Sequence, residues 1–140
     1  MKPLYTATAT SQGGRDGHVR SSDGIINLDV SMPKELGGPG KEATNPEQLF
    51  AAGYAACFES AFRLVARKKK VTVPEDAKIT AHATIGEDER DGGFKLAVKL
   101  EASVPGLADE TVNELLQAAH EVCPYSKATS GNIDVELVTK

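Results

Sequence analysis

The chain has 140 residues and a mass of 14.8 kDa, the size of one ordinary domain with a single core. Its net charge of −4 excludes nucleic acid as the main partner, because phosphate binding needs a basic face. No stretch approaches the roughly 18 consecutive apolar residues of a membrane span, and the first ten residues lack the apolar segment of a signal peptide. We therefore expect one domain over residues 1–140, located in the cytoplasm, with no membrane partner.

The first third of the chain predicts three strands. Residues 4–10 alternate as a strand does, and the glycine-rich residues 11–17 read as a turn. Residues 18–21 and 25–32 are expected to be the second and third strands, separated by a Ser-Asp-Gly turn. Residues 33–44, rich in glycine and proline, predict a loop.

A long helix is predicted next. Asn45 suits the N-cap, Pro46 suits the first helical position, and Gln48 completes a capping-box pattern. The helix is expected to run to about Lys70, where four consecutive basic residues at 67–70 complement the negative end of the helix dipole. We interpret this basic cluster as a helix end and not as a nucleic-acid patch.

This helix is apolar on nearly all sides between Leu49 and Val65, which predicts a buried central helix. A helix this apolar in so small a domain suggests cover from a second subunit. Gly53 lies in its interior, where glycine costs about 1 kcal/mol relative to alanine, so we expect a packing or access reason for it.

The remainder of the chain predicts a hairpin, a second helix and a last strand. Residues 78–87 and 94–104 alternate on either side of a glycine-rich turn at 90–93. Residues 109–122 have helical periodicity, and residues 132–138 read as a strand. The predicted order is βββ-α-ββ-α-β, which defines an α+β fold.

The two cysteines are the candidate reactive groups, and a structural disulfide, a metal site and thiol redox chemistry would each explain them. In a reducing cytoplasm a disulfide is usually transient and catalytic, which favours redox chemistry. Cys57 shares a helix face with apolar and aromatic residues, namely Phe50, Gly53, Tyr54, Ala61 and Leu64. Burial alone would make this thiol an inert core residue, so a reactive Cys57 needs a cation from elsewhere in the fold.

Cys123 lies where Pro124 stops the second helix, and a short turn is expected to follow. A thiol at such a break could shift to meet a partner, although it could also be a core residue at a helix end. His120 and Cys123 are spaced i, i+3 and could share a metal ion, but no second closely spaced pair completes a four-ligand set.

Two charged residues have ordinary explanations when taken singly. Arg15 lies in a glycine-flanked turn, where arginine is usually solvated. Glu47 lies in the first turn of the long helix, where a carboxylate complements the helix dipole.

Three segments together resemble the organic hydroperoxide resistance proteins, a branch of the family that also contains the osmotically inducible peroxidases. They are NPEQLFAAGYAACF (45–58), GGRDG (13–17) with SSDG (21–24), and CPYSKATSGNIDV (123–135). The resemblance covers essentially the whole chain, and the two cysteine motifs are far more specific than a lone cysteine.

The resemblance implies a thiol peroxidase that reduces alkyl and fatty-acid hydroperoxides to alcohols. Cys57 would be the peroxidatic thiolate and Cys123 the resolving thiol, with Arg15 holding the thiolate and Glu47 pairing with Arg15. Glu47 precedes Cys57 by about 15 Å of helix, so Arg15 would have to link them, within one chain or across two.

The resemblance also implies an intertwined homodimer, reduction by dihydrolipoamide or a lipoylated protein, and no metal or other cofactor. The Cys57 face predicts an apolar substrate pocket formed by Phe50, Tyr54 and Leu64, with Tyr125 near Cys123. Two other classes stay open: a non-enzymatic thiol sensor or binding module, and a structural zinc protein.

Overall fold

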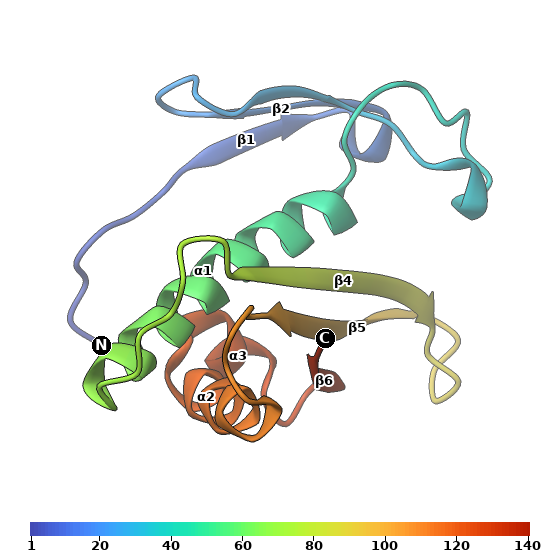
Figure 1. Cartoon of the computed structure of the whole chain (residues 1–140). Coiled ribbons are helices and arrows are strands. Elements are labelled where there is room, and N and C mark those ends of the chain that lie inside the picture. The colour runs from blue at the N-terminus through green and yellow to red at the C-terminus, as the bar shows by residue number, and fades with distance from the viewer. The chain divides into compact units, whose positions relative to one another are not determined.

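The computed structural model describes all 140 residues, which divide into two compact units, Met1–Leu49 and Phe50–Lys140. Each unit contains one three-stranded sheet, and the chain has three α-helices (Figure 1). The predicted α+β fold is confirmed, and the order of strands and α-helices differs from the predicted one only by an additional short α-helix after the second.

The sheet of the first unit is an antiparallel meander of β1 (Ala9–Gln12), β2 (Gly17–Ser21) and β3 (Asn27–Val30). Short 3-10 helices lie at Gly14–Asp16 and Lys34–Leu36. The predicted position of the first strand, residues 4–10, is largely wrong. Because β2 ends at Ser21, which pairs with Ala9, the residues before Ala9 have no strand to pair with.

The long helix α1 (Pro46–Lys68) begins as predicted at Asn45, whose Oδ1 accepts a hydrogen bond of 2.9 Å from the backbone N–H of Gln48. The reciprocal half of the capping box is wrong. The Gln48 side chain instead accepts a hydrogen bond of 3.0 Å from Thr44 Oγ1. The helix ends two residues before the predicted end, and Lys70 then takes a left-handed conformation with φ of 59°.

Within the single chain, α1 is buried along one stripe and open along another. The buried residues are Tyr54, Phe58, Ala61, Phe62, Val65 and Ala66. The open stripe, spaced by one turn, consists of Ala52, Ala56, Ser60 and Leu64. By length and composition α1 could also cross a membrane, contrary to the sequence-based expectation, but core helices of soluble proteins pass the same test.

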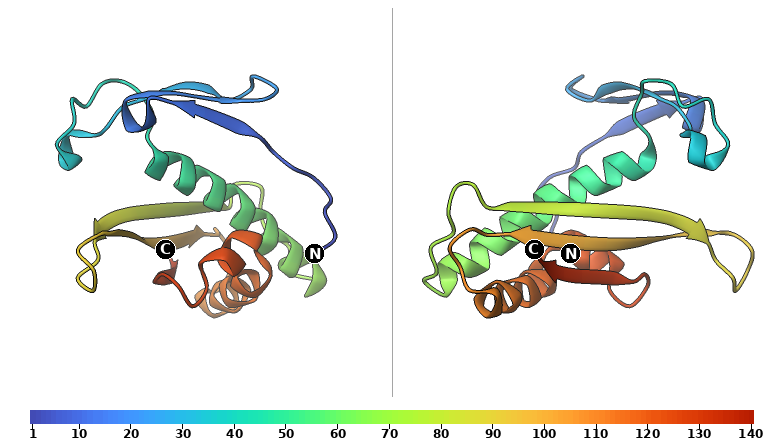
Figure 2. Two further views of the ribbon diagram at one scale, coloured as in Figure 1. Left: turned by 180° about the vertical axis from the view of Figure 1, so that it is seen from behind. Right: turned by 45° about the vertical axis from the view of Figure 1, so that its right-hand side comes forward.

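The second unit contains the predicted hairpin of β4 (Lys78–Glu87) and β5 (Phe94–Ser103), which is confirmed. Strand β6 (Val135–Thr139) pairs in parallel with β5, so the sheet order is β4-β5-β6 (Figure 2). The connection from β5 to β6 contains α2 (Asp109–Val122) and then α3 (Pro124–Thr129).

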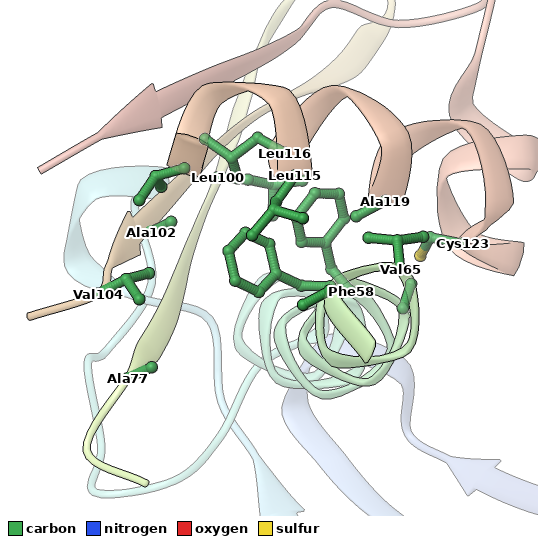
Figure 3. Close-up of a cluster of buried hydrophobic side chains, with 14 of the residues drawn as sticks. Phe58, Val65, Ala77, Leu100, Ala102, Val104, Leu115, Leu116, Ala119 and Cys123 are labelled. Atoms are coloured by element: carbon green, nitrogen blue, oxygen red, sulfur yellow. The ribbon is translucent and has the colours of Figure 1, made fainter. Parts of the chain in front are cut away.

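The core of the second unit lies between α1, α2 and one face of this sheet (Figure 3). Phe58 and Phe62 of α1 and Leu115 and Leu116 of α2 are almost completely buried. Cys123 belongs to the same cluster and is 0% exposed, so the end of α2 that carries it is anchored in the core.

Candidate active site

The structure brings the two cysteines together. Sγ of Cys57 and Sγ of Cys123 lie 3.7 Å apart, and both cysteines are free thiols. Cys57 is half-buried on α1, whereas Cys123 is fully buried. A disulfide requires sulfur atoms about 2.05 Å apart, so a displacement of roughly 1.6 Å would join them.

The position of Cys123 follows from the break at Pro124. Cys123 ends α2, with its N–H donating to the carbonyl of Ala119 at 2.9 Å, and its own carbonyl accepts from Lys127 of α3 at 2.9 Å. One residue therefore closes one helix and opens the next, because proline suits the first position of a helix but not its interior.

The surroundings of Cys57 oppose ionisation within this unit. Burial raises the pKa of the Cys57 thiol above its ordinary value of 9.0, and the neighbouring Cys123 thiol raises it further. The backbone N–H of Tyr125 acts in the opposite direction by donating a hydrogen bond toward the sulfur. A reactive thiolate at Cys57 consequently needs an additional positive charge.

Aromatic rings gather beside the cysteine pair. The ring of Tyr125 lies 5.6 Å from that of Tyr54 and 6.3 Å from that of Phe50, measured between centroids. Gly53 makes room for Tyr125, since a Cβ at this position would lie 2.6 Å from the Tyr125 hydroxyl oxygen. The packing reason expected for this helical glycine is therefore its contact with Tyr125.

The four residues predicted to form a substrate pocket differ in exposure. Tyr125 and Leu64 are each 38% exposed, and Phe50 is half-buried. Tyr54 is 0% exposed, and its hydroxyl is occupied by hydrogen bonds inside the core. A pocket role for these residues stays a prediction.

Arg15 and Glu47 form a bidentate ion pair inside the first unit. Nη1 and Nη2 of Arg15 donate to Oε2 and Oε1 of Glu47 at 2.9 and 2.8 Å. The guanidinium lowers the pKa of Glu47 below its ordinary value, and the hydrogen bond to Glu47 raises the pKa of Arg15. The pair holds a rigid, permanently charged cation at the start of α1.

Sequence reasoning missed a group of buried polar side chains beside Cys123. Tyr54, Ser126 and Thr129 are joined by hydrogen bonds, and Nδ1 of His120 lies 2.8 Å from Oγ of Ser126. The spacing of His120 and Ser126, three residues before and after Cys123, was the available signal. His120 and Cys123, whose i, i+3 spacing would allow them to share a metal ion, have no third ligand close enough to complete a site.

A dithiol in this setting can cycle between reduced and disulfide states without a bound cofactor. Cys57, half-buried on α1, is the thiol that an external molecule can reach, and Cys123 lies behind it. One reachable thiol beside one buried thiol is a geometry compatible with thiol redox chemistry, the class of protein that the fold and the site indicate.

Comparison with known proteins agrees with this class. The family model for OsmC-like proteins matches residues 38–138, and the chain therefore belongs to the OsmC-like family. The organic hydroperoxide resistance protein OhrA of Bacillus subtilis is 52% identical over 97% of this chain and 96% of its own length. The organic hydroperoxide resistance protein of Xanthomonas axonopodis pv. citri is 50% identical over 97% of this chain and 94% of its own.

Solved structures show the same fold. An organic hydroperoxide resistance protein from Legionella pneumophila superposes with a TM-score of 0.91 at 52% identity, covering 99% of both chains. The OhrB structure of Bacillus subtilis superposes with a TM-score of 0.90 at 47% identity, covering 99% of this chain and all of the other. Within the OsmC-like family, the chain therefore lies with the organic hydroperoxide resistance proteins, as its motifs predict.

Proposed function

We propose that this protein is a cysteine-based peroxidase that reduces organic hydroperoxides to alcohols. The observation that carries the proposal is the Cys57–Cys123 pair, with free sulfur atoms 3.7 Å apart and only Cys57 accessible. Membership of the organic hydroperoxide resistance group supplies the substrate class.

In the first step the Cys57 thiolate attacks the terminal oxygen of the hydroperoxide. The S–O bond forms as the O–O bond breaks, and the departing alkoxide takes a proton to leave as the alcohol. Two electrons pass from sulfur to the peroxide, which leaves Cys57 as a sulfenic acid. Arg15, held by Glu47, provides the positive charge that favours the thiolate.

In the second step the Cys123 thiol attacks the Cys57 sulfenic acid. The S–S bond forms, the S–O bond breaks, and the hydroxide leaves as water with the thiol proton. A dithiol reductant then restores both cysteines by thiol–disulfide exchange, and we assign this role to dihydrolipoamide or a lipoylated protein.

We further propose that the working form is an intertwined homodimer in the cytoplasm. The open stripe of α1 and the sheet of the first unit support this proposal. Strands β1 and β3 bury only one side chain, that of Val30, and leave Ile25, Ile26 and Leu28 exposed nearby. A second copy would cover this apolar surface.

The test is catalytic turnover. Purified protein at low concentration is mixed with excess tert-butyl hydroperoxide and either dihydrolipoamide or glutathione. We expect many turnovers with dihydrolipoamide and few with glutathione, with no turnover in Cys57→Ser. A single oxidation event that no dithiol reverses would identify a sensor or binding module and contradict the proposal.

A further inference from the structure

The short helix α3 is attached to the rest of its unit by buried hydrogen bonds, in addition to the ring contacts of its partly exposed Tyr125 with Phe50 and Tyr54. Its buried side chains are only Ser126 and Thr129, both of them polar. A six-residue helix is not stable alone in water, so its tertiary contacts determine where it lies, and those of Ser126 and Thr129 are the buried ones. Directional hydrogen bonds fix position and orientation, whereas apolar contacts tolerate sliding.

The hydrogen bonds connect α3 to both neighbouring helices. Oη of Tyr54 on α1 lies 2.9 Å from Oγ of Ser126 and 3.1 Å from Oγ1 of Thr129. Nδ1 of His120 on α2 lies 2.8 Å from the same Ser126 oxygen. Thr129 Oγ1 completes the chain by donating to the carbonyl of Ser126 at 3.2 Å.

Counting protons fixes the direction of every bond in this chain. The Ser126 carbonyl can only accept, so the single hydroxyl proton of Thr129 is donated to it. The bond between Tyr54 and Thr129 must then use the proton of Tyr54. Ser126 must then donate to Tyr54, and His120 must donate to Ser126 from Nδ1. The complete network therefore requires a proton on Nδ1 of His120.

The residues of this network lie close in sequence to both cysteines. Tyr54 lies one turn before Cys57 on α1, about 4.5 Å along the helix axis. His120 and Ser126 lie three residues before and after Cys123. A shift of α3 would move the Cys123 sulfur, because Cys123 is both the C-cap of α2 and the N-cap of α3.

We propose that Tyr54, Ser126, Thr129 and His120 are positioning residues that hold Cys123 against Cys57 and so set the rate of disulfide closure. This inference rests on the proposed peroxidase cycle and adds a determinant of its second step. The Cys57 sulfenic acid has two fates: attack by Cys123, which releases water, or oxidation by a second hydroperoxide to the sulfinic acid, which releases alcohol. The network favours the first fate.

The main test variant is Tyr54→Phe. It keeps the ring, and Ser126 retains His120 while Thr129 retains the Ser126 carbonyl, so no buried hydroxyl is left without a partner. The measurement is the ratio of disulfide to sulfinic acid, by intact-protein mass spectrometry after a graded series of cumene hydroperoxide. This ratio does not depend on the speed of the first oxidation, because both products come from the same sulfenic acid.

We expect the ratio to fall about fivefold in Tyr54→Phe, the effect of losing one ordinary hydrogen bond. Thr129→Val should reduce the ratio, and Thr129→Ser, which keeps the hydroxyl, should restore it. If Tyr54→Phe does not fold by circular dichroism, this Thr129 pair decides the question. Sulfinic acid formation is also compared in Cys123→Ser with and without Tyr54→Phe, to show that the second oxidation itself has not changed.

The tautomer of the His120 imidazole reports the state of the network independently of kinetics. The ¹⁵N chemical shifts of His120 in the reduced protein should show Nδ1 protonated, and Tyr54→Phe should reduce this preference. A wild-type ratio in both Tyr54→Phe and Thr129→Val, or a His120 with an unprotonated Nδ1, would overturn the inference while leaving the peroxidase intact. Absence of any trapped sulfenic acid in Cys123→Ser would instead refute the peroxidase itself.

Discussion

The backbone of Gly53 lies directly against the side chain of Tyr125, so that a Cβ on residue 53 would be 2.6 Å from the tyrosine oxygen and 3.1 Å from Cζ. Two segments that are far apart in sequence therefore approach closely beside Cys57, whose sulfur faces the backbone N–H of Tyr125. A glycine that is unfavourable in a helix by about 1 kcal/mol is used here to admit an aromatic ring.

This contact predicts that Gly53→Ala displaces Tyr125 and slows the reaction of Cys57 with organic hydroperoxides by about tenfold, as expected when the thiolate loses one N–H donor. The double variant Gly53→Ala with Tyr125→Phe removes the closest atom and should recover part of the rate. Stopped-flow measurement of Cys57 oxidation checks both. A full wild-type rate in Gly53→Ala would show that the contact has no influence on the thiol.

The local elements of this fold were largely predictable from sequence because they depend on neighbouring residues. The start of α1 at Asn45 and the β4–β5 hairpin follow from capping and from alternation. The misplaced first strand shows the limit, since a strand exists only where a partner extends, and β2 ends at Ser21.

The site was predictable only in part, for the same physical reason. The cysteines and Arg15 drew attention by residue type and motif. The contact of Tyr54 with Ser126 joins residues 72 positions apart, and no local pattern specifies it. Helix α3 was likewise expected as a turn, because its two inward residues are polar and leave no apolar periodicity to recognise.

The Arg15–Glu47 ion pair predicts a pH-dependent contribution to stability. The pKa of Glu47 is lowered in the folded state, so the contribution is present above the ordinary pKa of 4.5 and is lost as the pH falls through the lower, folded pKa. Because the Arg15 side chain is 34% exposed, the contribution is at most about 1 kcal/mol.

The measurement for this ion pair is the free energy of unfolding of wild type and Glu47→Gln between acidic and neutral pH. The difference should be constant near pH 7 and shrink below about pH 4.5. Glu35→Gln, which removes an exposed carboxylate from the same unit, serves as the control for net charge. An equal difference at pH 3 and pH 7 would show that the ion pair does not contribute.

Arg15 is further predicted to lower the pKa of Cys57 in the proposed homodimer. The surroundings of Cys57 in its own unit raise this pKa above 9.0, so a thiolate at neutral pH requires the cation. The rate of Cys57 alkylation by iodoacetamide, measured against pH, should have its midpoint below 9.0 in wild type and above it in Arg15→Ala. Coincident profiles would remove Arg15 from the mechanism.

In the proposed homodimer, the subunit whose Arg15 serves a given Cys57 can be identified by mixing variants. Neither Cys57→Ser nor Arg15→Ala should turn over organic hydroperoxide efficiently alone. If Arg15 of one chain serves Cys57 of the other, a mixed dimer contains one complete site and one doubly defective site, and activity partly returns. If both residues act within one chain, each mixed site lacks one residue and activity stays low. Activity is measured after co-refolding the two variants at equal concentration.

Substrate preference provides the last prediction. Phe50 and the partly exposed Tyr125 place apolar surface beside Cys57, and Leu64 is exposed two turns further along α1. Each methylene buried there contributes about 0.8 kcal/mol, so four or five would supply roughly 3–4 kcal/mol before the cost of ordering the substrate chain. Hydrogen peroxide has no carbon to bury. We therefore expect the second-order rate constant for Cys57 oxidation to rise from hydrogen peroxide through tert-butyl hydroperoxide to fatty-acid hydroperoxides, provided that the contacts persist in the transition state.

Leu64→Ser should flatten the rise, whereas Ser60→Ala, on the same open stripe, should leave it in place. A wild-type series led by hydrogen peroxide would mean that these apolar side chains serve packing and not substrate binding.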